Sequence, residues 1–245
     1  MKKALLLLAF CAIIAPCLAQ KPYYQVYKTA PTTDNIDVND IFMAYEDSCC
    51  KIVYNFWREY GEMGFVFINK IDENIYLHLD ETFYVANGYV NDYYKNRVYN
   101  CAPVLDDTRS SINSEPNDYS NGFSQAKALT MTEKPVVCVP AHASRAIKEY
   151  NIKNYIFRSE EIFLFPGKKD NNILEFSKAE SPFVFGNIVA YSVGNSQDIV
   201  RVENEFYVSS IANYAEGKTD ALFERGFPDG FFIPYFKTKE DNAKH

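Results

Sequence analysis

Residues 75–90 read IYLHLDETFYVANGYV and carry the strongest signal for the fold. Apolar residues at every second position from Ile75 to Leu79 show the two-residue period of a half-buried strand. The pair Asn87 and Gly88 then separates two short apolar runs, and this dipeptide suits the positive φ angles of a type I′ hairpin turn. The stretch therefore predicts antiparallel strands that follow one another along the chain.

Runs of β-branched and aromatic residues of the same kind recur along the whole chain. Their ranges are 52–57, 65–68, 75–79, 83–85, 89–90, 155–158, 162–165, 173–176, 183–185, 188–193, 199–200, 206–211 and 231–233. We expect a mainly β fold in which an antiparallel meander closes into a barrel, because closure leaves no exposed sheet edge. A β-sandwich is the alternative, since periodicity alone does not show closure.

Two or three short helices are expected beside the strands. Their ranges are 39–49, 141–150 and 219–225. Asp37 or Asn39 is suited to cap the first, because short polar side chains accept hydrogen bonds from the first turn of a helix. Thr219 or Asp220 is suited to cap the last, and Gly226 to end it.

The N-terminal segment 1–19 has the pattern of a cleavable signal peptide. Lys2 and Lys3 precede an apolar run that is shorter than the roughly 20 residues of a membrane-spanning helix, and Ala19 suits cleavage. We therefore expect a secreted, extracellular protein. No second run is long enough to predict a membrane span.

A single β-rich domain is expected over residues 20–245, with a long polar loop at 103–135 and a charged tail at 237–245. The formal net charge is −7 at pH 7, and loss of two lysines with the leader makes it more negative. Nucleic acids and anionic membranes favour clustered basic residues, so neither is an expected partner.

The cysteines predict a disulfide framework. After removal of the leader, the remaining cysteines are Cys49, Cys50, Cys101 and Cys138. A bridge between the neighbours Cys49 and Cys50 would be strained, because their side chains diverge. Each is therefore expected to pair with Cys101 or Cys138, in either arrangement.

No catalytic residue, metal site or cofactor is predicted. The sequence lacks the serine-hydrolase elbow, the HExxH zinc motif, the P-loop and the dinucleotide-binding glycine pattern. His78 and Asp80 share a strand face, but two potential ligands at this spacing are common by chance. An extracellular hydrolase is the weaker alternative and needs an arrangement such as His78 beside Asp106 or Glu160.

The C-terminal segment 206–241 orders a strand, a short helix, a glycine-rich turn and a last apolar strand. With the signal peptide, the meander and the disulfides, this layout resembles that of secreted lipocalins. The resemblance implies a β-barrel carrier of small molecules. The Gly-x-Trp motif that opens a lipocalin is absent, because Trp57 follows Asn55 and Phe56, so no binding residue is carried over.

Aromatic residues suggest what the domain binds. The chain holds 19 Tyr and 19 Phe, and several strands carry large rings on both faces, as in a sheet with a core on one side and a ligand or partner on the other. We expect a non-enzymatic carrier or scavenger of a small hydrophobic or aromatic ligand, held in the barrel by Tyr76, Phe83, Val85 and Tyr191. The alternative is a module that presents an aromatic sheet face, or the 103–135 loop, to another extracellular protein.

Overall fold

The computed structural model describes residues 22–101, 129–167, 173–215, 219–238 and 241. The predicted leader, residues 103–128 of the predicted loop and most of the predicted tail lie outside these ranges. The end of the predicted loop is described, and it contains strand β10 (Leu129–Thr132).

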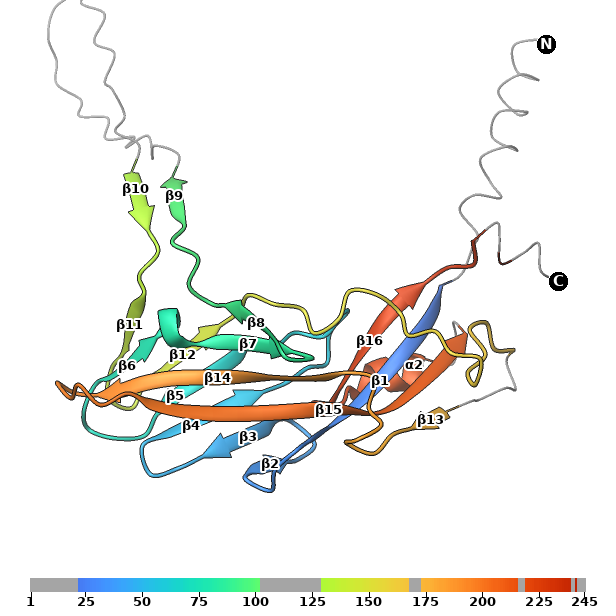
Figure 1. Cartoon of the computed structure of the whole chain (residues 1–245), viewed down its shortest axis with the longest axis horizontal. Helices are drawn as coiled ribbons and strands as arrows, with labels where there is room; N and C mark the ends of the chain where they lie inside the picture. The colour runs from blue at the N-terminus through green and yellow to red at the C-terminus, as the bar shows by residue number, and fades with distance from the viewer. Residues whose placement is uncertain (1–21, 102–128, 168–172, 216–218, 239–240, 242–245) are drawn as a thin grey trace, which may run out of the picture.

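The larger of the two main sheets is antiparallel and curls as half of a barrel along the long axis of the molecule (Figure 1). Its main path runs, in spatial order, through β11 (Val136–Val139), β6 (Ile75–His78), β14 (Val184–Val193), β15 (Val200–Ala215), β1 (Tyr23–Pro31) and β16 (Gly230–Tyr235). Three strands join at the side of this path: β7 (Phe83–Ala86), β8 (Tyr89–Asp92) and β13 (Ile173–Glu175).

The second sheet is smaller and also antiparallel. Its order is β12 (Ser144–Ile147), β5 (Phe65–Asn69), β4 (Cys50–Tyr54), β3 (Met43–Glu46) and β2 (Ile36–Val38). Among the described residues, strand β9 (Val98–Cys101) pairs only with β10, and the two form a ribbon that stands away from the body (Figure 1). The described helices are α2 (Asp220–Arg225) and the 3₁₀ turn η2 (Leu79–Glu81).

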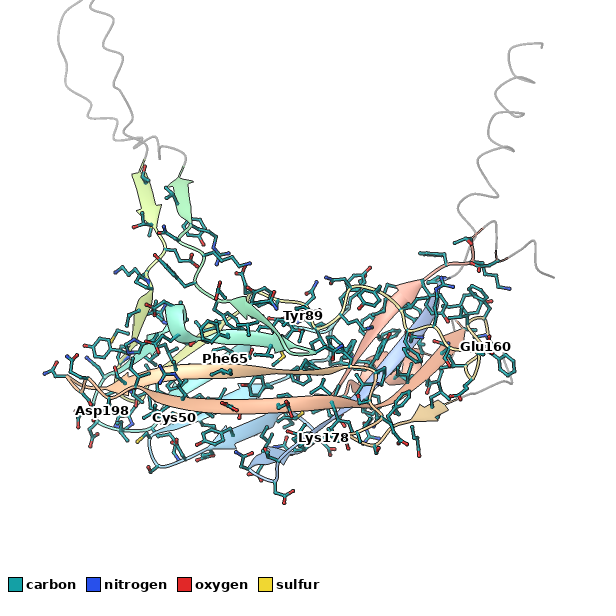
Figure 2. All side chains as sticks on the ribbon, in the orientation of Figure 1. Cys50, Phe65, Tyr89, Glu160, Lys178 and Asp198 are labelled. Atoms are coloured by element: carbon teal, nitrogen blue, oxygen red, sulfur yellow. The ribbon has the colours of Figure 1, made fainter. Side chains whose placement is uncertain are left out.

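The hydrophobic core lies between the two main sheets. Tyr54 of β4 packs edge-on against Phe206 of β15, with ring centroids 5.3 Å apart. The Tyr54 hydroxyl also accepts a hydrogen bond of 2.8 Å from the Asn204 side chain. Figure 2 shows Cys50 and Phe65 within the body and Tyr89, Glu160, Lys178 and Asp198 at its periphery. The core is therefore a packed apolar layer that contains a few hydrogen-bonded polar groups.

The mainly β prediction is confirmed, and the predicted hairpin is found where expected. Asn87 and Gly88 have φ angles of 46° and 82° and connect β7 to β8. The predicted closed barrel is wrong, because β11 and β16 end the main path without pairing with each other in the described part of the chain. Strands β4 and β5 pack their buried face against the larger sheet instead of extending it.

Two of the predicted helices are wrong. Residues 39–49 contain the turn between β2 and β3, where the Asn39 side chain accepts hydrogen bonds from the backbone N–H groups of Ile41 and Phe42. Residues 141–150 contain β12, which pairs with the edge of β5. The predicted helix at 219–225 is confirmed as α2, whereas the predicted strands at 155–158 and 162–165 are irregular in the structure.

Candidate functional site

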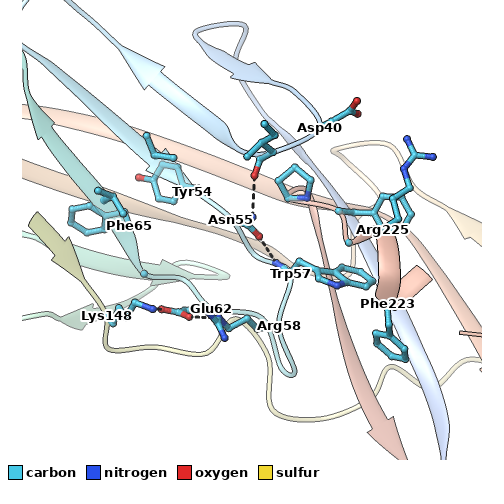
Figure 3. Close-up of a pocket in the computed structure, with 17 residues that line it drawn as sticks. Asp40, Tyr54, Asn55, Trp57, Arg58, Glu62, Phe65, Lys148, Phe223 and Arg225 are labelled. Atoms are coloured by element: carbon cyan, nitrogen blue, oxygen red, sulfur yellow. Dashed lines mark hydrogen bonds and ion pairs between the residues drawn. The ribbon is translucent and has the colours of Figure 1, made fainter. Parts of the chain in front are cut away.

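An open pocket of about 550 Å³ lies beside the end of β4 and contains the single tryptophan of the sequence (Figure 3). We call it the Trp57 pocket. Its walls come from the turn between β2 and β3, the end of β4, the start of β5, Lys148 after β12, and the connection from α2 to β16. The lining residues are Asp40, Ile41, Val53, Tyr54, Asn55, Trp57, Arg58, Glu62, Gly64, Phe65, Val66, Lys148, Phe223, Arg225, Gly226, Phe227 and Pro228.

Local hydrogen bonds fix the chain at the entrance to Trp57. Phe56 continues the buried face of β4, and its N–H donates to the Pro228 carbonyl at 2.9 Å. Trp57 N–H donates to the Asn55 side-chain oxygen at 3.0 Å, and the Asn55 amide donates to the Ile41 carbonyl at 3.0 Å. The strand end is therefore tied both to the β2–β3 turn and to the connection that precedes β16.

Three phenylalanines surround the indole ring. The ring centroid of Trp57 lies 6.0 Å from that of Phe223, 5.3 Å from Phe227 and 5.4 Å from Phe232. Gly226 lets the backbone approach the indole, because a Cβ atom there would stand 3.1 Å from Trp57 Cδ1. The result is an aromatic wall on one side of the pocket, a surface that suits a flat ring of a ligand.

The indole N–H lacks a hydrogen-bond partner within the described part of the chain. This donor belongs to a residue that lines the pocket, so a ligand acceptor can take it. Tyrosine and tryptophan usually satisfy such a group when they are buried. Here the pairing is left to a bound molecule or to solvent.

Charged side chains form two groups at the rim. Glu62 holds Arg58 at 2.8 Å and Lys148 at 2.7 Å, one on each carboxylate oxygen. On the opposite rim, Asp40 and Arg225 form no ion pair with any described residue. Figure 3 shows these two groups on either side of Trp57. The first is electrostatically satisfied, and the second can still bind polar groups of a ligand.

The residues predicted to hold a ligand are not brought into one cavity. Tyr191 is buried between the sheets, with its ring centroid 5.5 Å from that of Phe67. Tyr76, Phe83 and Val85 lie on the opposite face of the same sheet, since their strand partners Ser192, Ile188 and Gly186 alternate with the core residues of β14. Val85 lines a separate pocket of about 180 Å³.

Cys49, Cys50 and Cys138 are free thiols in this structure, so the predicted disulfides are not present. Both predicted arrangements join Cys138 to Cys49 or Cys50. Cys138 lies on β11 of the larger sheet, whereas Cys49 and Cys50 lie at the start of β4 in the smaller one. Burial raises the pKa of the Cys50 thiol to about 12. The side chain of Cys101 lies outside the described part.

His78 forms a hydrogen bond with an uncharged side chain. Its Nε2 lies 3.0 Å from the Ser192 hydroxyl, on the outer face of the larger sheet. Across the described ranges, no three His, Cys, Asp or Glu side chains are grouped so that they could hold a metal ion. Nor does any helix there have the length and apolar character needed to cross a membrane.

Trp57 was not predicted as a site residue from the sequence. Alternation in the predicted strand 52–57 places Trp57 on its outward face, which is unusual for so large an apolar ring, and this was the available signal. Its partners Phe223 and Phe227 come from the far end of the chain and could not be paired with it by periodicity. Comparison with models of protein families, with curated proteins and with solved structures finds no match.

Proposed function

We propose that this protein is a secreted, non-enzymatic binding protein whose Trp57 pocket takes a small ligand with an aromatic or apolar ring. The aromatic wall formed by Trp57, Phe223 and Phe227 is the observation that carries the proposal. The volume of the Trp57 pocket, about 550 Å³, lies within the range of roughly 300–1,000 Å³ typical of small-molecule sites. Secretion is supported by the signal-peptide pattern of residues 1–19.

The polar groups of the pocket orient the proposed ligand. An acceptor on the ligand takes the indole N–H, and Arg225 and Asp40 bind polar groups at the rim. Arg225 also lies over the Phe227 ring, with Cζ 5.8 Å from the ring centroid, so it can stay close to a bound aromatic group. The ligand class is therefore a small aromatic molecule with at least one polar substituent.

The experiment uses the emission of Trp57, which is the single tryptophan in the sequence. The purified protein is titrated with phenol, indole and an anilinonaphthalene sulfonate dye, and binding is confirmed by calorimetry. We expect a saturable change in tryptophan emission with at least one probe, and weaker binding in the Phe223→Leu variant.

Phe176→Leu is the matched control, because Phe176 packs against Phe157 away from the pocket, with ring centroids 6.0 Å apart. The control should bind as the unaltered protein does. Absence of saturable binding for all three probes would overturn the proposal, as would equal affinity losses in the two variants.

A second candidate function is recognition of another extracellular protein through the ribbon of β9 and β10. Val98 and Met131 on this ribbon are 58% and 59% exposed, which is high for apolar side chains. A Val98→Ser, Met131→Ser double variant distinguishes the two functions. The double variant should keep the change in Trp57 emission that the probes cause. It should lose any increase in native mass that the unaltered protein shows when it binds a protein in its own secretion medium.

A further inference from the structure

A second pocket, of about 300 Å³, adjoins the Trp57 pocket. We call it the Lys28 pocket. The residues that line both pockets are Asp40, Arg225, Gly226, Phe227 and Pro228. The Lys28 pocket adds Lys28, Val38, Asn39 and Asp229. Because Phe227 is part of the aromatic wall and also lines the second space, a ligand whose ring lies against the wall can extend a substituent past Phe227 into the Lys28 pocket.

An irregularity of strand β1 lies beside this pocket. The register between β1 and β15 shifts between Lys28 and Thr29, as at a β-bulge. Bulges often redirect a side chain beside a site. The next residue fastens β1 to the connection before β16, since the N–H and the hydroxyl of Thr29 donate to the Asp229 carbonyl at 2.7 and 2.8 Å. Lys28 and Asp229 are therefore held at the same pocket by a shared set of backbone contacts.

Two cations of the Lys28 pocket lie over one aromatic ring. Lys28 Nζ lies 4.5 Å from the ring centroid of Phe227, and Arg225 Cζ lies 5.8 Å from the same centroid. Neither side chain forms an ion pair or a hydrogen bond with any described residue. Like charges repel at this range, and an anion beside them would relieve the repulsion. The two cations can therefore share one carboxylate of a ligand.

Two carboxylates line the same pocket. Asp40 comes from the turn between β2 and β3, and Asp229 directly precedes β16. Among the described residues, neither carboxylate has an ion-pair partner, although Arg225 and Lys28 line the same space. Figure 3 shows Asp40 and Arg225 on the same side of Trp57. The Lys28 pocket thus presents unpaired charges of both signs, and these charges balance.

We propose that the Lys28 pocket is a subsite for an ammonium group and a carboxylate group, and that the ligand is a free amino acid with an aromatic side chain. The inference rests on the proposed function, because the ring of the amino acid takes the aromatic wall. Lys28 and Arg225 bind the carboxylate, and Asp40 and Asp229 bind the ammonium. A ligand with one charge would leave either the cations or the carboxylates unpaired, whereas a zwitterion pairs both.

The distances suit a ligand of this size. The ring centroid of Phe227 lies 5.3 Å from that of Trp57 and 4.5 Å from Lys28 Nζ. In phenylalanine the carboxylate lies about 5 Å from the centre of the ring, because the bonds between them are about 1.5 Å long. A ring that packs on Trp57 can therefore place its charged groups beside Phe227, where the cations lie.

The test compares four probes that share one benzene ring and differ in charge. They are phenylalanine, 3-phenylpropanoate, 2-phenylethylamine and the uncharged 2-phenylethanol. The purified protein is titrated with each at neutral pH, and Trp57 emission and calorimetry give the dissociation constants. Exposed ion pairs change an affinity by up to about fivefold, so we expect phenylalanine to bind at least about threefold more tightly than each other probe.

Two variants separate the two halves of the subsite. Lys28→Met removes a cation and should weaken phenylalanine and 3-phenylpropanoate about threefold, but should not weaken 2-phenylethylamine. Asp229→Asn removes a carboxylate and should weaken phenylalanine and 2-phenylethylamine instead. Lys178→Met is the matched control, because Lys178 lines neither pocket and pairs with Glu205 at 3.2 Å. The control should bind all four probes as the unaltered protein does.

The outcomes distinguish this inference from the proposed function. If 2-phenylethanol binds as tightly as phenylalanine, the charged subsite is overturned, while ring binding at the Trp57 pocket stands. If one singly charged probe binds as tightly as phenylalanine, the pocket takes one charge and the amino-acid assignment is overturned. Equal affinity for phenylalanine in Lys28→Met and Lys178→Met would also overturn it. If none of the four probes binds while phenol or indole does, the proposed function stands and this inference fails.

Discussion

Replacement of Gly226 by alanine should destabilise the protein and change the environment of Trp57 at the same time. Gly226 has a φ of 66° and a ψ of 164°, a backbone region that is essentially reserved for glycine and costs other residues about 1–3 kcal/mol. The added Cβ would also stand 3.1 Å from Trp57 Cδ1 and 3.4 Å from Nε1, so the indole must shift. We expect a loss of about 2 kcal/mol or slightly more in the free energy of unfolding.

Urea denaturation measures this loss, and tryptophan emission measures the shift of the ring. With a slope of about 2 kcal/mol per molar urea, the midpoint should fall by about 1 M while the slope stays constant. Gly88→Ala is the matched control, because Gly88 also has a positive φ of 82° but a Cβ there would meet nothing within 4 Å. We expect it to cost about 1 kcal/mol and to leave the emission unchanged. The reasoning is refuted if the two variants lose equal stability and Trp57 emission is unaltered in both.

Three further outcomes follow from other contacts. Arg97 lowers the pKa of Glu133 to about 2 through a hydrogen bond of 2.7 Å. The carboxylate therefore stabilises the fold above its unfolded pKa of about 4.5, and this contribution is lost as the pH falls toward 2. The difference in urea midpoint between Glu133→Gln and the unaltered protein should be largest at neutral pH and should shrink as the pH falls from about 4.5 toward 2. Tyr54→Phe leaves the Asn204 amide without its partner and should cost about 1–3 kcal/mol in the same assay, whereas Tyr45→Phe at a half-buried site should cost less. A thiol reagent followed by peptide mapping should modify the half-buried Cys49 and Cys138 in the native protein and spare Cys50, and modification of Cys50 at an equal rate would contradict the burial described for it.

The buried face of each strand was predictable, because it depends on local alternation. Ile52 and Tyr54 were expected on the inner face of their strand, and both are fully buried. Alternation does not show whether a strand pairs with the neighbouring strands of one barrel or packs its apolar face against a second sheet. The same apolar face of β4 would suit either a closed barrel or a layer packed against a second sheet, and the contacts with β15 decide the outcome.

Side chains that accept backbone hydrogen bonds were also ambiguous, because the tertiary pairing of the next segment is not visible in the sequence. Asn39 accepts hydrogen bonds from the backbone N–H groups of Ile41 and Phe42, which is what a helix-capping residue does, but here they close the turn between two strands. Asp47 does the same for the N–H groups of Cys49 and Cys50 before β4. Such a side chain shows that the chain turns, and tertiary pairing determines whether a helix or a strand follows.

The Trp57 pocket depends on an interaction that no local pattern encodes. Trp57 follows the end of β4, and the connection between α2 and β16 covers part of it through Phe227 and the close approach of Gly226. The contacts that stabilise this connection are therefore the same contacts that build the aromatic wall. A ligand that packs against the wall must then stabilise the C-terminal segment, by an amount that grows with the logarithm of its concentration above the dissociation constant. Binding at the pocket and the stability of α2 and β16 are thus two measures of one set of contacts.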